Sequence, residues 1–253
     1  MKTLRDIWLV FLRYFGILIR NPVWVVLGVV QPVLYLVLFA PLLKSLSANP
    51  GVPAGGAYNW FVPGLLIQLG MFGAAGVGFG LIAELRGGVV ERMRVTPVSR
   101  LALLLGRALR DILMLDVQAA ILIVLSLPFG LKLHFDGALV VLALIALLGL
   151  LTASISYACA LWLKSEDSFA PLIFTSTLPL LLLSGVLLPL TLAPPWLRNI
   201  AAFNPLSYAV DAARAVFNDH LTDVSVEKGV LISAVLALVA VALAVRSFGR
   251  ALA

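Results

Sequence analysis

Charged residues are scarce in this chain, and their scarcity indicates its class. Asp, Glu, Lys and Arg make up 12% of the 253 residues, against about 25% in ordinary soluble domains. Hydrophobic residues make up 62%, and the mean hydropathy is +1.10. A soluble core of this size cannot bury so much apolar surface, so the composition predicts a single membrane domain over residues 1–253.

Motifs for redox chemistry, zinc binding and ATP hydrolysis are also missing. The single cysteine, Cys159, lies in an apolar run, which excludes an intrachain disulfide and a cysteine zinc site. The chain has no GxxxxGK[ST] loop, so it is not a standard P-loop ATPase. His134 and His220 fall in expected outer loops, which leaves Ser184 without a base for nucleophilic catalysis. We therefore expect no enzyme activity, metal or cofactor in this chain.

What the chain has in abundance is long apolar runs, each near the roughly twenty residues that cross a bilayer. They cover residues 23–43, 61–83, 112–131, 138–163, 169–188 and 229–245. The predicted fold class is therefore all-α, a polytopic membrane protein with six transmembrane helices. An even number of spans places both termini on the same side.

Lysine and arginine are distributed unequally between the two sides of these spans. Five of the eighteen lie on one side, and the other thirteen lie on the side of the termini. The thirteen are Lys2, Arg5, Arg13, Arg20, Arg86, Arg92, Arg94, Arg100, Arg107, Arg110, Lys164, Arg246 and Arg250. The positive-inside rule then predicts that both termini face the cytoplasm, and we expect the membrane to be a bacterial inner membrane. Basic residues interleaved with spans also argue against a nucleic-acid partner.

Residues 1–22 are predicted to form an amphipathic connecting helix that lies in the membrane interface. Their charged residues fall within about 100° of the helical wheel, and these are Lys2, Arg5, Asp6, Arg13 and Arg20. Asn21-Pro22 is expected to break this helix before the first span. The alternative is a cytoplasmic extension of the first span.

Two connecting segments are long enough to carry function. In the cytoplasmic segment 84–110, Gly87 and Gly88 permit a sharp turn, and a short charged helix is expected over 89–95. Such a helix would transmit a push from a partner to two membrane helices, whereas the alternative is a solvated positive loop. The outer segment 189–228 is too apolar for a solvated loop, and we expect residues 203–217 in it to form a re-entrant helix.

Three stretches of the sequence resemble the ABC-2-type permease family. The run Glu91-Arg92-Met93-Arg94-Val95-Thr96-Pro97-Val98-Ser99-Arg100 is similar to the loop between that family's second and third spans. The run Ala202-Phe203-Asn204-Pro205-Leu206-Ser207-Tyr208-Ala209-Val210-Asp211-Ala212-Ala213-Arg214 is similar to the stretch before its last span. Together with Leu183-Ser184-Gly185-Val186-Leu187-Leu188-Pro189, they most resemble the daunorubicin-resistance type of drug-exporter permease.

The resemblance implies a half-transporter that forms a homodimer or heterodimer and binds two copies of an ABC ATPase subunit. ATP and magnesium would then be bound by that partner. The coupling residues carried over are Glu91, Arg92, Met93, Arg94, Val95, Thr96 and Pro97. The outer re-entrant motif carried over consists of Asn204, Pro205, Tyr208, Asp211 and Arg214.

The function predicted is export of a hydrophobic or amphipathic substrate by alternating access. A drug, lipid or glycolipid fits best, because few polar side chains line the expected spans. The alternative is a secondary transporter or channel without an ATPase, in which Asp116 would relay protons. Otherwise Asp116 is expected to be solvated or paired with Arg107 or Arg110. A third reading is a membrane enzyme or scaffold.

Overall fold

The computed structural model describes residues 2–46, 56–94, 98–131, 134–186, 190 and 193–251. Most of these residues are helical, and none of the described residues is in a strand. The helices are α1 (Lys2–Arg20), α2 (Val23–Leu46), α3 (Gly56–Ala75), α4 (Val77–Arg86), α5 (Val89–Arg94), α6 (Arg100–Ser126), η1 (Leu127–Phe129), α7 (Phe135–Leu163), α8 (Glu166–Leu182), α9 (Pro195–Ala201), α10 (Pro205–Phe217) and α11 (Val224–Ala251). The all-α prediction is confirmed.

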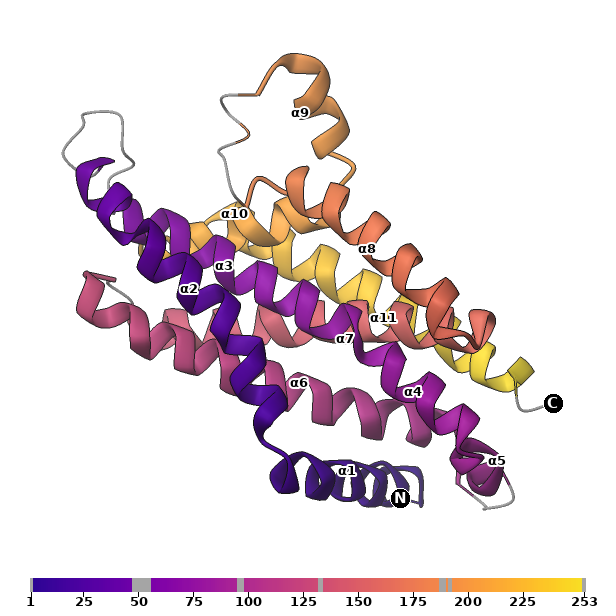
Figure 1. The fold of residues 1–253 in the computed structure, drawn as a ribbon. Coiled ribbons are helices and arrows are strands. Elements are labelled where there is room, and N and C mark those ends of the chain that lie inside the picture. Colours follow the sequence, from indigo (N-terminus) through magenta and orange to yellow (C-terminus); the bar gives the residue numbers. More distant parts are fainter. Residues whose placement is uncertain are drawn as a thin grey trace.

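The long helices run alongside one another as a bundle, and α1 lies across one end of it (Figure 1). The two chain ends and α5 lie at this end of the bundle, whereas α9 and α10 lie at the opposite end. The segment expected to couple to a partner and the expected re-entrant segment are therefore separated by the length of the bundle.

Four helical segments in the described part of the chain are long and apolar enough to cross a membrane. They are Gly56–Arg86, Arg100–Phe129, Phe135–Leu163 and Val224–Gly249. The bent pair of α1 and α2 adds a fifth when it is counted as one span. Helix α8 has 17 residues and contains Pro171 and Pro179, so a sixth span remains a prediction.

The junction of α1 and α2 bends sharply, by 71°. It falls at Asn21-Pro22, as predicted, because Pro22 cannot continue the hydrogen bonds of α1. The Pro22 carbonyl instead accepts from the backbone N–H of Val25, at 2.9 Å, in the first turn of α2. A straight extension of the first span by residues 1–22 is therefore excluded.

The span predicted over 61–83 is interrupted at Gly76, where α3 ends and α4 begins. The Ser156 hydroxyl of α7 fills this interruption. It donates to the Ala75 carbonyl at 2.7 Å and accepts from the Gly78 N–H at 2.9 Å. Side chains inserted into the helical ladder are a known cause of such breaks, and here the side chain also satisfies the backbone groups that the break exposes.

Helix α6 begins at Arg100, so the expectation that the loop extends to residue 110 is wrong. The reason is a helix cap, since the Ser99 side chain accepts a hydrogen bond from the Ala102 N–H at 3.2 Å. Helices α4 and α11 also extend beyond the ends of the apolar runs, to Arg86 and Ala251. Hydropathy locates the apolar centre of a helix, but capping decides where the helix ends.

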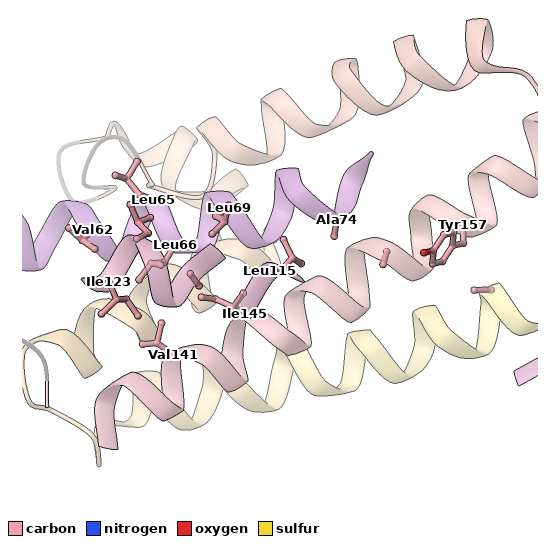
Figure 2. Packing of buried hydrophobic residues seen from close by; sticks show 14 of the residues in the cluster. Val62, Leu65, Leu66, Leu69, Ala74, Leu115, Ile123, Val141, Ile145 and Tyr157 are labelled. Carbon is pink, nitrogen blue, oxygen red and sulfur yellow. The ribbon is translucent and has the colours of Figure 1, made fainter. Parts of the chain in front are cut away.

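The main core lies where α3, α6 and α7 meet (Figure 2). Val62, Leu65 and Leu66 of α3 are fully or almost fully buried. They pack with Ile145 of α7 and Leu115 of α6, in the same cluster. This core packs α3 against α6 and so fixes their relative position. These are the helices that precede and follow the α4–α5 segment in the chain.

Candidate functional site

Helix α5 is the helix expected over 89–95, and it is anchored on one side. Gly88 has a φ of +65°, a conformation that glycine adopts at little cost, and it lies in the turn between α4 and α5. Val90 and Met93 are buried, and Met93 packs with Tyr14 of α1 and Leu103 of α6. The anchored side therefore faces the bundle.

The remaining predicted coupling residues divide into two groups. Glu91, Arg92 and Arg94 belong to α5, whereas Val95, Thr96 and Pro97 lie outside the described residues. Arg92 is exposed and caps the turn before its own helix, because its guanidinium donates to the Gly88 and Gly87 carbonyls at 3.3 and 3.2 Å. The chain therefore presents a cationic side chain on the outer face of α5.

A buried polar cluster, which we call the Arg107 cluster, joins α1, α4, α5 and α6. It consists of Tyr14, Glu84, Met93 and Arg107. An Arg107 terminal nitrogen lies 2.5 Å from Glu84 Oε2, and the Tyr14 hydroxyl donates to the same oxygen at 2.9 Å. The guanidinium also stacks on the Tyr14 ring, 4.9 Å from its centroid, and lies 3.9 Å from Met93 Sδ. One arginine thus contacts all three of the other helices.

The Arg107 cluster holds α4 and α6 together through a charge pair. The Arg107 side chain is only 3% exposed, and separating a buried charge from its partner is costly. Helix α5 joins the cluster through Met93, whose Sδ lies 3.9 Å from the guanidinium. Sequence reasoning missed this cluster because it assigned Glu84 and Arg107 to the cytoplasmic segment 84–110 and proposed no pairing between them. The available signal was Ser99, a residue type that favours the start of a helix.

A second buried polar group lies one turn further along α6. Asp111 is 1% exposed; its Oδ2 accepts from the Tyr157 hydroxyl of α7, and its Oδ1 forms an ion pair with Arg110 at 3.2 Å. The expected pairing of Asp116 is wrong, because Arg107 pairs with Glu84 and Arg110 with Asp111. Asp116 Oδ1 has no hydrogen-bond partner.

The backbone of α1 approaches α6 closely at Gly106. A Cβ added there would lie 2.6 Å from Val10 Cβ and 2.9 Å from the Ile7 carbonyl. Real side chains do not tolerate such contacts, so any larger residue must push α1 away. Gly106 is thus what allows Tyr14 to reach the Arg107 cluster.

We expect Gly106→Val to displace α1 and to destabilise the protein by about 1–3 kcal/mol, the usual cost of overpacking. Heat-induced loss of monodisperse protein in detergent measures this effect. The matched control is Gly16→Val in α1, where an added Cβ meets nothing within 4 Å. Equal behaviour of the two variants would show that α1 does not rest on α6 as described.

At the opposite end of the bundle, Asn204 joins α10 to the end of α8. Its Oδ1 accepts from the Leu206 N–H at 3.1 Å, and its amide nitrogen donates to the Leu180 carbonyl at 2.7 Å. Pro205 takes the first position of α10, where proline is favoured. The Tyr208 hydroxyl donates back to the Ala202 carbonyl at 2.9 Å. The expected helix over 203–217 is thus present as α10.

Arg214 ties α10 to two other segments. Its guanidinium donates to the Gly185 carbonyl at 2.7 Å, to the Val186 carbonyl at 3.3 Å and to the Trp60 carbonyl at 3.3 Å. It also lies 4.1 Å from the centroid of the Trp60 ring, at cation–π distance. Burial lowers the pKa of Arg214 to about 10, and the Asp211 carboxylate opposes this shift, so the side chain is charged at neutral pH. Asp211 itself is exposed.

The segments that carried the family resemblance thus lie at the two ends of the bundle. Comparison with known proteins supports the same family. The family model described as ABC-2 type transporter matches residues 5–218. The chain is 30% identical over 203 residues to ycf38 of Porphyra purpurea, named as a transport permease, covering 79% of this chain and 69% of the relative.

Two bacterial relatives are more distant. YbhR of Escherichia coli (strain K12), named as a probable multidrug ABC transporter permease, is 25% identical over 170 residues, covering 63% of this chain and 44% of YbhR. DrrC of Mycobacterium tuberculosis (strain ATCC 25618 / H37Rv), named as a probable doxorubicin resistance ABC transporter permease protein, is 24% identical over 197 residues, covering 77% of this chain and 70% of DrrC. The chain is a multi-pass membrane protein and belongs to the ABC-2 type transporter family.

Proposed function

We propose that this chain is the membrane-spanning permease subunit of an ATP-driven exporter. It pairs with a second permease chain, and each permease binds one ATPase subunit through α5. ATP and magnesium are bound by the ATPase subunits. The single observation that carries the proposal is the Arg107 cluster, because it links the short helix α5, on which Arg92 is exposed, to α1, α4 and α6.

The proposed topology has six spans, with α8 as the fifth, and both termini in the cytoplasm of a bacterial inner membrane. The excess of lysine and arginine on the side of the termini supports this orientation. The location of both chain ends and α5 at one end of the bundle is consistent with it (Figure 1). Helix α1 then lies at the cytoplasmic interface, with Leu4, Trp8 and Leu12 exposed along one stripe toward the lipid.

The cargo proposed is a hydrophobic or amphipathic molecule, such as a drug, lipid or glycolipid. The names of YbhR and DrrC concern drugs, and the scarcity of charged residues in the spans supports an apolar path. At the outer end, α9 and α10 would cap the exit, held by Asn204 and Arg214. Alternating access would open this cap when α5 moves with the ATPase.

Co-purification with candidate ATPase subunits tests the coupling role of α5. We expect the wild-type chain to retain an ATPase, and the double substitution Glu91→Ala/Arg94→Ala to reduce retention about tenfold, which corresponds to about 1.4 kcal/mol of binding free energy. The matched control is Arg86→Ala/Glu166→Ala, which removes an exposed ion pair near the same end of the bundle. That control is expected to retain the ATPase.

Two results would contradict the proposal. One is equal retention by the α5 variant and the wild type, which would place the ATPase contact elsewhere. The other is transport in liposomes that needs an ion gradient, no ATPase and an intact Asp116. The second result would identify the chain as a secondary transporter, because an unpaired carboxylate within a span is the group that such transport would use.

A further inference from the structure

A cavity of about 680 Å³ lies in the angle between α1 and α2, against α3, α4 and α6. A smaller cavity of about 200 Å³ continues it along α2 and α3. The two share four lining residues, Leu27, Gly28, Phe72 and Gly73, so they form one elongated slot. The larger volume alone is in the range of small-molecule sites.

Polar side chains line this slot along its length and not at one end only. They are Asn21, Glu84, Arg110, Gln118, Gln31 and Gln68. Gln118 follows Arg110 by eight positions in α6, which is about 12 Å along a helix. A plain hydrocarbon chain would leave polar groups without partners at more than one level, so the slot suits a molecule that carries polar groups of its own.

Two buried glutamines of the slot have no hydrogen-bond partner on Oε1 within the described part of the chain. Gln118 is 1% exposed and Gln68 is 5% exposed. The Gln118 amide nitrogen donates to the Trp24 and Val25 carbonyls at 3.2 Å. Its Oε1 would lie 3.9 Å from a Cβ added at Gly73, so the oxygen faces a glycine of the slot wall. Buried acceptors without a donor are rare in native proteins, and a bound molecule that donates hydrogen bonds would satisfy them.

We propose that the slot binds a neutral glycoside with an apolar aglycone. The sugar hydroxyls donate to the amide oxygens of Gln118 and Gln68, and the aglycone lies against Trp24 and Phe79. The proposal deepens the proposed function, and it rests on that function in treating the bound molecule as cargo.

The charged groups of the slot favour a neutral molecule. The side chains of Glu84 and Arg110 are 25% and 26% exposed. Each is already paired, Glu84 with Arg107 and Arg110 with Asp111. A net cation or anion would enter the slot without a counter-charge of its own, and burying an unpaired charge is costly.

Hydroxyl groups match the glutamines better than other donors do. An amide group holds an acceptor oxygen beside a donor nitrogen, and each sugar hydroxyl both donates and accepts, whereas an ammonium group only donates and adds a charge. A sugar ring also has C–H faces that can pack on an aromatic ring by dispersion. Phe72 offers such a ring, because it lines both cavities at the level where they join.

The slot wall between the Gln118 level and the charged end is apolar and smooth. Trp24 and Phe79 line it, together with Gly76 and Gly80 of the α3–α4 segment. A Cβ added at Gly80 meets nothing within 4 Å, so space is open on this face. An aglycone fits here, since its contacts are dispersive and need no polar partner.

Photocrosslinking of the purified chain in phospholipid nanodiscs tests the proposal without any ATPase. The probe is an alkyl glucoside with a diazirine in its alkyl chain, and the reference probe carries the same chain on a phosphocholine head group. We expect the glucoside to label slot residues such as Trp24 and Phe79 about tenfold more than the reference does, the effect of one additional hydrogen bond. Displacement by unlabelled dodecyl glucoside would identify a glycolipid and displacement by naphthyl glucoside a small glycosylated molecule, and either supports the proposed class.

The variant Gln68→Leu separates recognition from folding. It removes the amide at similar size, so glucoside labelling should fall about tenfold while labelling by the reference probe stays unchanged. Thermal stability without glucoside should equal or exceed that of the wild type, because the variant no longer buries an unpaired acceptor. The matched control is Thr152→Val outside the slot lining, where the hydroxyl donates within α7 to the Leu148 carbonyl at 2.8 Å. This control should leave glucoside labelling unchanged.

Three results would overturn the proposal. Equal labelling by the two probes would show that the slot retains the alkyl chain alone, as it would any lipid. Glucoside labelling that is unaltered in Gln68→Leu would place the sugar elsewhere, and adducts that neither competitor displaces would show that the slot does not recognise a glycoside. Because no ATPase is present, failure of the coupling proposal leaves these results unchanged, and failure here leaves ATPase retention by α5 unchanged.

Discussion

Replacing Arg107 with alanine is expected to uncouple α5 from the membrane helices and to lower ATP-driven transport about tenfold, within the range usual for coupling between sites. The substitution leaves the Glu84 carboxylate without its guanidinium and removes the stacking on Tyr14. Because one partner of a buried ion pair is lost, we also expect a destabilisation of about 3 kcal/mol. Transport by the reconstituted complex and thermal denaturation of the permease measure the two effects separately.

A double-mutant cycle separates the pair from the packing around it. Glu84→Ala/Arg107→Ala removes both charges. Its loss in free energy of unfolding should be about 2 kcal/mol smaller than the sum of the losses in the two single variants. The exposed pair Arg86–Glu166, with side chains 55% and 43% exposed, provides the control and should contribute less than about 1 kcal/mol. Additive effects for Glu84 and Arg107 would mean that their ion pair is not what holds α1, α4 and α6 together.

The fold was predictable where one strong physical signal decides the structure. Apolar runs located the centres of α2, α3–α4, α6, α7 and α11, because the bilayer requires about twenty apolar residues for each crossing. Asn21-Pro22 located the bend between α1 and α2. Helix ends were less predictable, since capping by Ser99 and the capture of Arg107 by Glu84 extend α6 beyond its apolar run.

The candidate site was predictable only in its local parts. The sequence predicts α5 and α10 as helices, because glycine, proline and asparagine mark their ends. It does not predict the Arg107 cluster, which joins residues up to 93 positions apart, from Tyr14 to Arg107. Lysine and arginine counts for topology treat every basic residue as solvated. The rule counts Arg107 as a basic residue but says nothing about its burial or its partner.

At each end of the bundle, one buried or half-buried arginine holds several segments together. Arg107 fixes the helices at the end of the bundle that holds the chain termini through a carboxylate, whereas Arg214 fixes the segment at the opposite end through three backbone carbonyls. Arginine suits both tasks, because its planar group carries five donors and holds several acceptors at once. Helix α10 contacts α3, α7 and α11, so the Arg214 contacts set how firmly the proposed outer cap is closed.

Replacing Arg214 with alanine is therefore expected to release the segment after α8 from α10. The Gly185 and Val186 carbonyls lose the Arg214 donor, and the Trp60 carbonyl of α3 loses a second one; we expect a cost of about 3 kcal/mol in total. Arg214→Lys should rescue less than half of this loss, because an ammonium group cannot reproduce the planar fork or its stacking on Trp60. Thermal denaturation in detergent measures the loss of stability.

The control for this experiment is Arg198→Ala, which removes an exposed arginine from α9 in the same outer segment. It should change stability by no more than about 0.5 kcal/mol, as surface substitutions usually do. Limited proteolysis then separates a local from a global effect, since a released cap should be cut between α8 and α9 while α3, α6 and α7 stay intact. If Arg214→Lys were as stable as the wild type, charge alone would hold the segment, and the three carbonyl contacts would not be what closes the cap.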